Sequence, residues 1–244
     1  MSDKLRNVVG AVPWPRLLIE GGVIVFSILL AFAIDAWWDD RQERDRELQQ
    51  LARVNAELRL NQQSFINKLN TLQSAFDSAV SQQALMGDSP QPVDAEALAR
   101  LWDQILGIGT FSVPSRAIDE YLAAAAESDP EFAVIRDQLT EWLYRTERVS
   151  NQYDILRQKH SALTEHLLSI PELRVLGYLP NWMKAAGLPE SRFPSDITVL
   201  LSDPIVENLL GDYMLRVVVL TSMLEQQIES LDKLADLIDS ATVL

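Results

Sequence analysis

The first strong pattern in the chain is an apolar stretch bounded by tryptophan. Residues 17–38 read LLIEGGVIVFSILLAFAIDAWW, with Trp14 before them and Trp37 and Trp38 at their end. As a helix rising about 1.5 Å per residue, this stretch would extend roughly 33 Å, enough to cross a hydrocarbon core of about 30 Å. Tryptophans at both ends are typical of membrane–water interfaces. We therefore expect a short N-terminal tail (1–16), a transmembrane helix (17–38) and three interface anchors, Trp14, Trp37 and Trp38.

A cleaved signal peptide is the alternative interpretation of this stretch. The unbroken apolar run from Gly21 to Ile34 is only about 14 residues long, and Ala31-Phe32-Ala33 matches the A-x-A cleavage pattern. Three features oppose cleavage. Glu20 lies where a signal core should be apolar, no Pro or Gly breaks the helix before the cut, and two bulky tryptophans follow it. These features favour an uncleaved anchor.

Four small or polar residues lie close to one face of the expected transmembrane helix: Glu20, Ser27, Ala31 and Asp35. At 100° per residue, the first three project within about 40° of one another. An ionisable group well inside a bilayer costs about 2.5–3.5 kcal/mol on insertion scales. Either the two acids lie among headgroups at the helix ends, or the stripe packs against another membrane helix. These four are the candidate membrane-helix packing residues.

A heptad pattern follows the apolar stretch. Residues 39–86 contain neither Pro nor Gly, and apolar residues recur every seven positions, which is typical of a helix that packs on other helices. The repeating positions are Leu51, Leu58, Phe65, Leu72 and Ala79, and the expected companion row is Leu48, Leu69 and Phe76. Asn55 and Gln62 interrupt the second row, which favours a bundle helix over a free coiled coil.

Local start and stop signals divide the middle of the chain. The segment Gly87–Pro92 is a helix breaker, and Asp94 is an N-cap that predicts a helix over 94–106. A loop is expected over 107–114 and a helix over 115–127. Asp129-Pro130 combines an N-cap with a proline at the first helical position, which predicts a helix over 130–169.

The C-terminal part repeats this pattern. Four prolines between 171 and 196 predict a long connection, and the segment 197–201 (ITVLL) could form a short strand. Asp203-Pro204 predicts a helix over 204–240. Its apolar rows are Leu210, Val217, Leu224, Leu231 and Ile238, with Tyr213, Leu220 and Leu234 beside them. We expect an all-α fold: an N-terminal transmembrane helix continuous with a long helix of an extramembrane helical bundle, residues 39–244, whose long helices cover about 39–86, 130–169 and 204–240.

Composition narrows the chemistry. The 244 residues are 48% hydrophobic, so wholesale disorder is not expected. The formal net charge of −14 disfavours nucleic acid as a partner. The chain has no cysteine, which excludes disulfides, thiolate metal sites and a cysteine nucleophile.

Candidate catalytic and metal-binding residues were weighed and set aside. His160 and His166 lie six residues apart and project about 120° from each other on one helix, so they cannot bind one ion together. Asp119 and Glu120 fit a solvated helix face better than an acid pair, and nothing marks Ser112 or Ser115 as a nucleophile. Trp102, Trp142 and Trp182 are expected in the core or at interfaces. We expect no enzyme activity, no catalytic or metal-binding residues and no cofactor.

The stretch AFAIDAWWDDRQERDRELQQLARVNAELRLNQQ carries a family resemblance. With its Glu-containing apolar helix, it resembles the N-terminus of the DUF6090-like family of uncharacterised bacterial single-pass membrane proteins. A weaker match is Thr110-Phe111 with Pro114; where relatives often have a Ser-Gly turn, this chain has alanines and Glu127. The resemblance implies a cytoplasmic N-terminus and an extracytoplasmic, periplasmic helical domain, and it carries no activity.

Basic residues flank the apolar stretch on both sides, so their count alone leaves the orientation open. The resulting hypothesis is a membrane-anchored helical interaction or oligomerisation module. Its partners are the lipid bilayer and either a second copy or another membrane protein. The alternative is a sensory or ligand-binding ectodomain that relays through its transmembrane helix, with a pocket roofed by residues 107–116 and 177–196.

Overall fold

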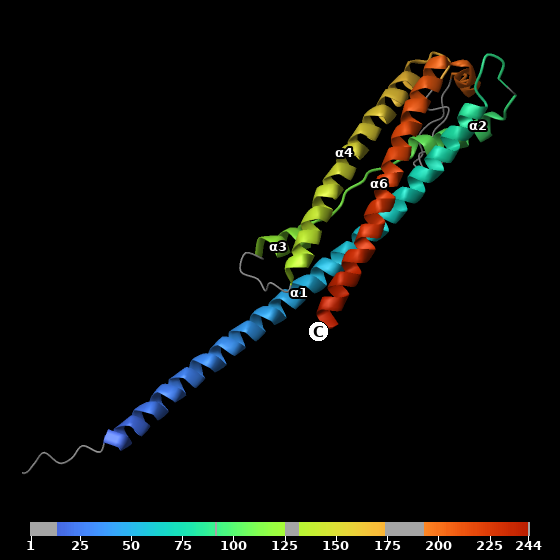
Figure 1. Cartoon of the computed structure of the whole chain (residues 1–244). Coiled ribbons are helices and arrows are strands. Elements are labelled where there is room, and N and C mark those ends of the chain that lie inside the picture. The colour runs from blue at the N-terminus through green and yellow to red at the C-terminus, as the bar shows by residue number, and fades with distance from the viewer. Residues whose placement is uncertain (1–13, 91, 125–131, 174–192, 244) are drawn as a thin grey trace, which may run out of the picture. The chain divides into compact units, whose positions relative to one another are not determined.

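The computed structural model describes residues 14–90, 92–124, 132–173 and 193–243 (Figure 1). Over these ranges the elements are helices and no strand is present, which confirms the all-α prediction. They are α1 (Trp14–Ala84), α2 (Ala95–Leu106), α3 (Arg116–Ala124), α4 (Ala133–Ser169), the 3-10 helix η4 (Ile197–Ser202) and α6 (Pro204–Val243).

The chain divides into two compact units, residues 1–50 and 51–244. The expected bundle domain began at residue 39, whereas the second unit begins at Leu51. Leu51 is also the first apolar side chain without exposed surface among the residues described. The reason is composition: residues 39–50 (DDRQERDRELQQ) are almost all charged or polar and supply little to a core.

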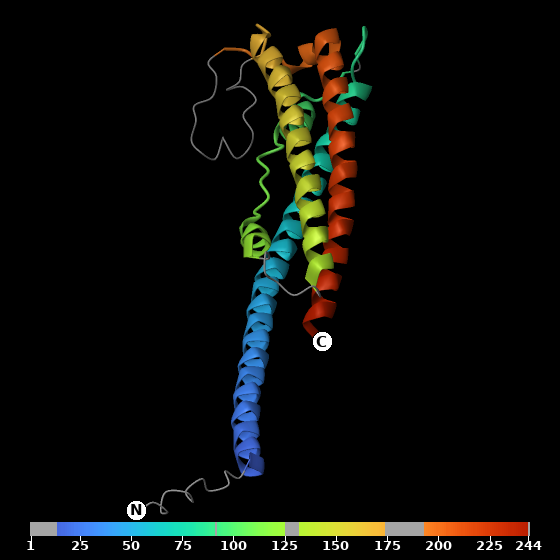
Figure 2. The same cartoon turned by 60° about the vertical axis from the view of Figure 1, so that its left-hand side comes forward.

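In the second unit, α4 and α6 lie side by side and run in opposite directions (Figures 1 and 2). The portion of α1 from 51 to 84 is antiparallel to α6: Asn55 Nδ2 donates to Asp239 at 2.6 Å, and Gln62 Nε2 donates to Asp232 at 2.5 Å. Later residues of α1 therefore meet earlier residues of α6.

The same portion of α1 is parallel to α4. The Phe65 ring lies 6.5 Å from the Trp142 ring, and the Lys68 ammonium lies 4.9 Å from the centre of the Tyr153 ring. Two parallel helices cannot be joined by a tight turn, because the chain must first return along the length of the bundle. The segment that makes this return, residues 84–132, determines much of the packing described below.

The first predicted row of α1 and both rows of α6 are confirmed. All five α1 residues at the seven-residue spacing are at most 1% exposed, and the predicted α6 residues are at most 3% exposed. The predicted companion row of α1 is wrong, because Leu48, Leu69 and Phe76 are only partly buried. The buried second row of the bundle portion is instead Val54, Asn61, Lys68, Ala75 and Gln82.

The return segment consists of α2, an extended stretch and α3. The extended stretch covers residues 107–115, termed the strap, and has no regular secondary structure, as the sequence predicted for 107–114. It runs antiparallel to α1, since Lys68 contacts Ile108 whereas Asn61 contacts Pro114. Side-chain donors of α1 thus lie against extended backbone rather than against another helix.

Local start signals act as predicted where the structure describes them. Asp94 accepts hydrogen bonds from the amides of Glu96 and Ala97, and α2 ends at Leu106. Asp203 accepts from two amides at the start of α6, whose first residue is Pro204. The expected start at Pro130 and the connection that includes Trp182 lie outside the described residues; α4 is described from Ala133.

The possible strand over 197–201 is wrong. These residues form the 3-10 helix η4, because Asp196 accepts a hydrogen bond from the amide of Thr198 at 2.9 Å and so caps a helical turn. Three side chains of η4 are buried: Ile197, Leu200 and Leu201. The Leu201 carbonyl accepts from the amide of Gly87, which ties η4 to the turn after α1.

Candidate functional sites

The apolar N-terminal part of α1 is long and apolar enough to cross a membrane. Its 18-residue window has a mean hydropathy of 2.0, and none of that window is buried. By length and composition, this is the one such segment found in the part of the chain that the structure describes.

The predicted packing residues all lie on this exposed helix. Glu20, Ser27, Ala31 and Asp35 are each exposed. The Ser27 hydroxyl donates to the carbonyl of Val23 at 2.8 Å, so it is satisfied within its own helix. A serine bonded in this way can face lipid or a second helix without an unpaired donor.

Two of the three predicted interface anchors are described. Trp37 and Trp38 are 59% and 60% exposed, and their rings lie 6.4 Å apart at an angle of 58°. The Trp14 side chain lies outside the described residues. The two exposed indoles end the apolar segment, which is where headgroups would meet a membrane helix.

The strap and the end of α2 are held by polar side chains from all three long helices. Lys68 Nζ and Asn61 Nδ2 of α1 donate to the carbonyls of Ile108 and Pro114, each at 2.7 Å. The remaining contacts join His160 Nε2 to Leu106 O at 3.1 Å, the Tyr213 hydroxyl to Ile105 O at 3.2 Å, and the Tyr153 hydroxyl to Gly109 O. Extended backbone leaves its carbonyls without helix partners, so the surrounding helices must supply donors. This explains why polar residues occupy the second buried row of α1.

Lys68 is the most unusual member of this group. It is 7% exposed, and its ammonium lies 4.9 Å from the centre of the Tyr153 ring and 5.8 Å from that of Phe111. Burial lowers the pKa of Lys68, because the charged form loses its hydration. Phe111 also packs on Phe65, with ring centres 5.5 Å apart. The sequence gave no sign that Lys68 is buried, since a lysine in a helix is normally solvated.

Gly109 allows the strap to turn at its centre. Its φ of +63° lies in the left-handed region, where a side chain is strained. Its carbonyl accepts the Tyr153 hydrogen bond. The turn thus presents this carbonyl to α4.

The remaining candidate residues have structural partners. Ser115 donates to Asp119 at 2.8 Å, and Glu120 pairs with Arg116 at 2.8 Å. His166 Nε2 lies 2.9 Å from Asp203, whereas His160 faces α2, so the two histidines serve different contacts. No group of three His, Cys, Asp or Glu side chains within the described ranges is arranged to hold a metal ion.

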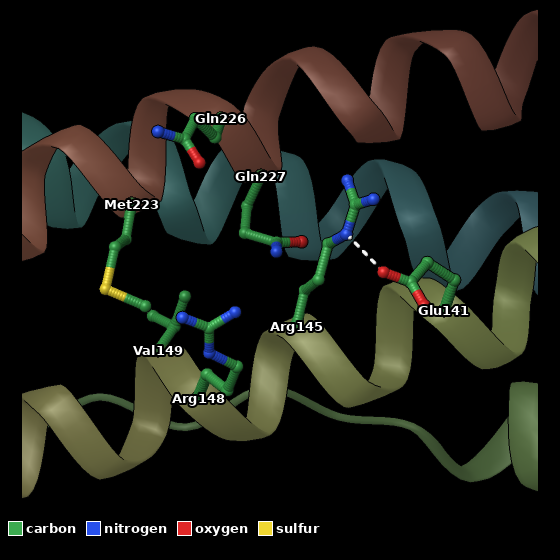
Figure 3. Close-up of a pocket in the computed structure, with 7 residues that line it drawn as sticks. All are labelled: Glu141, Arg145, Arg148, Val149, Met223, Gln226 and Gln227. Atoms are coloured by element: carbon green, nitrogen blue, oxygen red, sulfur yellow. Dashed lines mark hydrogen bonds and ion pairs between the residues drawn. The ribbon is translucent and has the colours of Figure 1, made fainter.

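A pocket of about 410 Å³ lies between α4 and α6 (Figure 3). Six of its lining residues are Glu141, Arg145, Arg148, Val149, Met223 and Gln227. Arg145 Nε pairs with Glu141 at 2.8 Å. Gln227 reaches from α6 toward α4 and is 4% exposed, and its Oε1 has no hydrogen-bond partner. The sequence did not predict this pocket, because its residues come from helices more than 70 positions apart.

The side of α6 opposite the core carries an apolar patch. Leu215, Val218 and Val219 are 57%, 48% and 38% exposed. They project away from the buried residues Tyr213 and Val217 of the same helix. We call these three residues the outer α6 patch.

Comparisons with known proteins assign no family to this arrangement. No protein-family model matches the chain, and no curated protein and no solved structure shows significant similarity to it. The function is therefore argued from the residues themselves.

Proposed function

We propose that this chain is a membrane-anchored helical interaction module that associates with a second copy of itself. The observation that supports the anchor is the apolar segment of α1, whose 18-residue window has a mean hydropathy of 2.0 and no buried surface. A core helix of a soluble protein would bury most of such a window. An apolar surface of this size in water would drive association, whereas in lipid it is at rest. No catalytic activity is part of this proposal.

The proposed orientation has a cytoplasmic N-terminus and a periplasmic helical domain. It follows from the resemblance to the DUF6090-like family in the stretch around Asp35 and Trp38, and kinship with that family is part of the proposal. Glu20 and the tryptophans after the apolar run support an anchor that is retained rather than cleaved.

Fractionation tests the anchor directly. The full-length chain is expected in the membrane fraction after a high-pH wash, and released only by detergent. Its N-terminal sequence should precede Glu20. Recovery in the soluble fraction, or a mature chain that starts at Ile34, would refute the anchor.

Self-association is supported by two surfaces, one in each unit. In the apolar segment, Ser27 and Ala31 form the small centre of a stripe that also carries two acids, and small residues let membrane helices approach closely. In the helical domain, the outer α6 patch is apolar and faces away from the core. A shared membrane holds every copy in one orientation and raises the local concentration, so weak surfaces suffice for pairing.

The mass of the purified protein in detergent, measured by light scattering, tests self-association. A dimer or larger oligomer is expected. Leu215→Lys places a charge in the outer α6 patch and should shift the protein toward monomer, whereas Leu60→Lys, at a 71% exposed position on α1, should leave the mass unchanged. A wild-type protein that is strictly monomeric in detergent and in nanodiscs would refute the proposal.

The stripe in the apolar segment has a matched control on the same helix. Ala31→Leu enlarges the stripe, whereas Ala33→Leu makes the same change about 200° around the helix. Only the first should weaken association. Equal effects would show that the stripe is not the contact.

A sensory or ligand-binding ectodomain is the second candidate. The α4/α6 pocket favours it, since Gln227 presents a buried polar group there. The pocket lies between the two helices rather than under residues 107–116, where the sequence predicted a roof. The rest of the predicted roof, 177–192, lies outside the described residues.

A further inference from the structure

We propose that the pocket between α4 and α6 binds a small carboxylic acid with a hydrogen-bond donor next to the carboxylate, namely an α-hydroxy or α-amino acid. This inference is independent of self-association, because every residue that carries it belongs to one chain. It gives the second candidate function a chemical class of ligand.

Two arginines supply the anion-binding part of the pocket. Arg145 uses its Nε for the ion pair with Glu141, which leaves its two terminal nitrogens for another acceptor. Arg148, one turn further along α4, has no hydrogen bond or ion pair among the described residues. Planar guanidinium groups match the two oxygens of a carboxylate. In a chain with a net charge of −14, two arginines at one pocket are a local exception.

Gln227 supplies the part that selects for a donor. Its side chain is 4% exposed and lines the pocket, and its Oε1 is buried without a hydrogen-bond partner. A buried acceptor without a partner is unfavourable, because it has given up its hydrogen bonds to water. A simple anion offers no donor to this oxygen. A hydroxyl or ammonium group beside the carboxylate does.

The rest of the lining limits the size of the ligand. Val149 and Met223 form an apolar wall suited to a short carbon body (Figure 3). The volume of about 410 Å³ is near the lower end of the range for small-molecule sites. The three parts together fit a compact metabolite rather than a polymer.

Calorimetry on the full-length protein in detergent tests the proposal with four probes: L-lactate, L-serine, acetate and inorganic phosphate. L-Lactate or L-serine should bind at least about tenfold more tightly than acetate, the equivalent of about 1.4 kcal/mol. Arg148→Ala should weaken that binding at least about tenfold. Arg157→Ala is the matched control: it removes an exposed arginine of the same helix outside the pocket, and should change nothing.

Gln227→Leu separates the two parts of the pocket. It should reduce the preference for L-lactate over acetate and leave weak carboxylate binding by the arginines. Circular dichroism verifies that this buried substitution retains the helical fold, and Arg148→Ala provides the answer from an exposed position if it does not. The proposal is overturned if neither acid binds, if acetate or phosphate binds as tightly as L-lactate, or if the two arginine variants behave alike. Failure here would leave the dimer mass unaffected, so it is distinguishable from failure of the self-association proposal.

Discussion

The contact between Glu57 and α3 gives the sharpest prediction about the fold. The Glu57 carboxylate of α1 accepts hydrogen bonds from the amide of Ala117 at 3.1 Å and from that of Ile118 at 3.3 Å. These amides belong to the first turn of α3, where helix amides have no partner within the helix. The nearby Ser115 hydroxyl is bonded to Asp119 instead. A residue of another helix thus does the work of an N-cap.

Replacing Glu57 with alanine should therefore destabilise the domain by an amount that the structure sets. Loss of an N-cap contact costs about 0.5–2 kcal/mol, and loss of a negative charge near a helix N-terminus costs about 0.3–1 kcal/mol. Glu57 is half-buried, so we expect about 1–2 kcal/mol in total. In a domain of this size, such a loss lowers Tm by roughly 2–8 °C. Glu57→Gln keeps an acceptor and should lose less.

Thermal unfolding and hydrogen exchange measure this effect together. The amides of Ala117 and Ile118 should exchange faster in Glu57→Ala, because they lose their acceptor. The matched control is Glu147→Ala, which removes an exposed glutamate from α4. If both variants unfold at the same temperature and the two amides remain protected, the assignment of Glu57 as the cap of α3 is wrong.

Three further predictions concern the second unit. Lys68→Met leaves the buried Ile108 carbonyl without its donor and should lower the free energy of unfolding by about 1–3 kcal/mol in chemical denaturation; an unchanged midpoint would contradict this. Leu224→Ala should cost about 2–5 kcal/mol in the same assay, whereas Leu215→Ala, in the outer α6 patch, should cost about 0.5 kcal/mol or less. For Asp203, burial acts to raise the pKa, but hydrogen bonds from His166 and the first amides of α6 outweigh it and hold the pKa below 3.8. Its stabilisation is therefore present above pH 3.8 and is lost as the pH falls through the native pKa, and Asp203→Asn should flatten that part of an acid denaturation curve.

The predictions that succeeded from sequence depend on short-range physics. Asp94 and Asp203 start helices because their side chains reach amides two and three residues ahead. The row through Leu58 and Phe65 was readable because helix periodicity places residues seven apart on one side. The length and apolarity of the segment that ends at Trp38 are also properties of the chain alone.

The predictions that failed depended on what lies opposite a residue. Leu69 and Phe76 are apolar and were expected inside, yet they are only partly buried. Asn61 and Lys68 are polar and were expected outside, yet they are buried. Hydrophobicity predicts burial well where helix packs on helix, because helix backbone satisfies itself. It fails where a helix faces extended backbone, whose carbonyls require donors.

The sequence by itself therefore determined that this protein has long amphipathic helices, where most of them begin and end, and that one of them is apolar enough for a membrane. Only the tertiary structure decided that the strap returns along α1, that Lys68 lies inside, and that Arg148 and Gln227 meet at one pocket. The physical reason is range. Caps and periodicity act over a few residues, whereas a donor's acceptor and a pocket's opposite wall come from segments that only folding brings together.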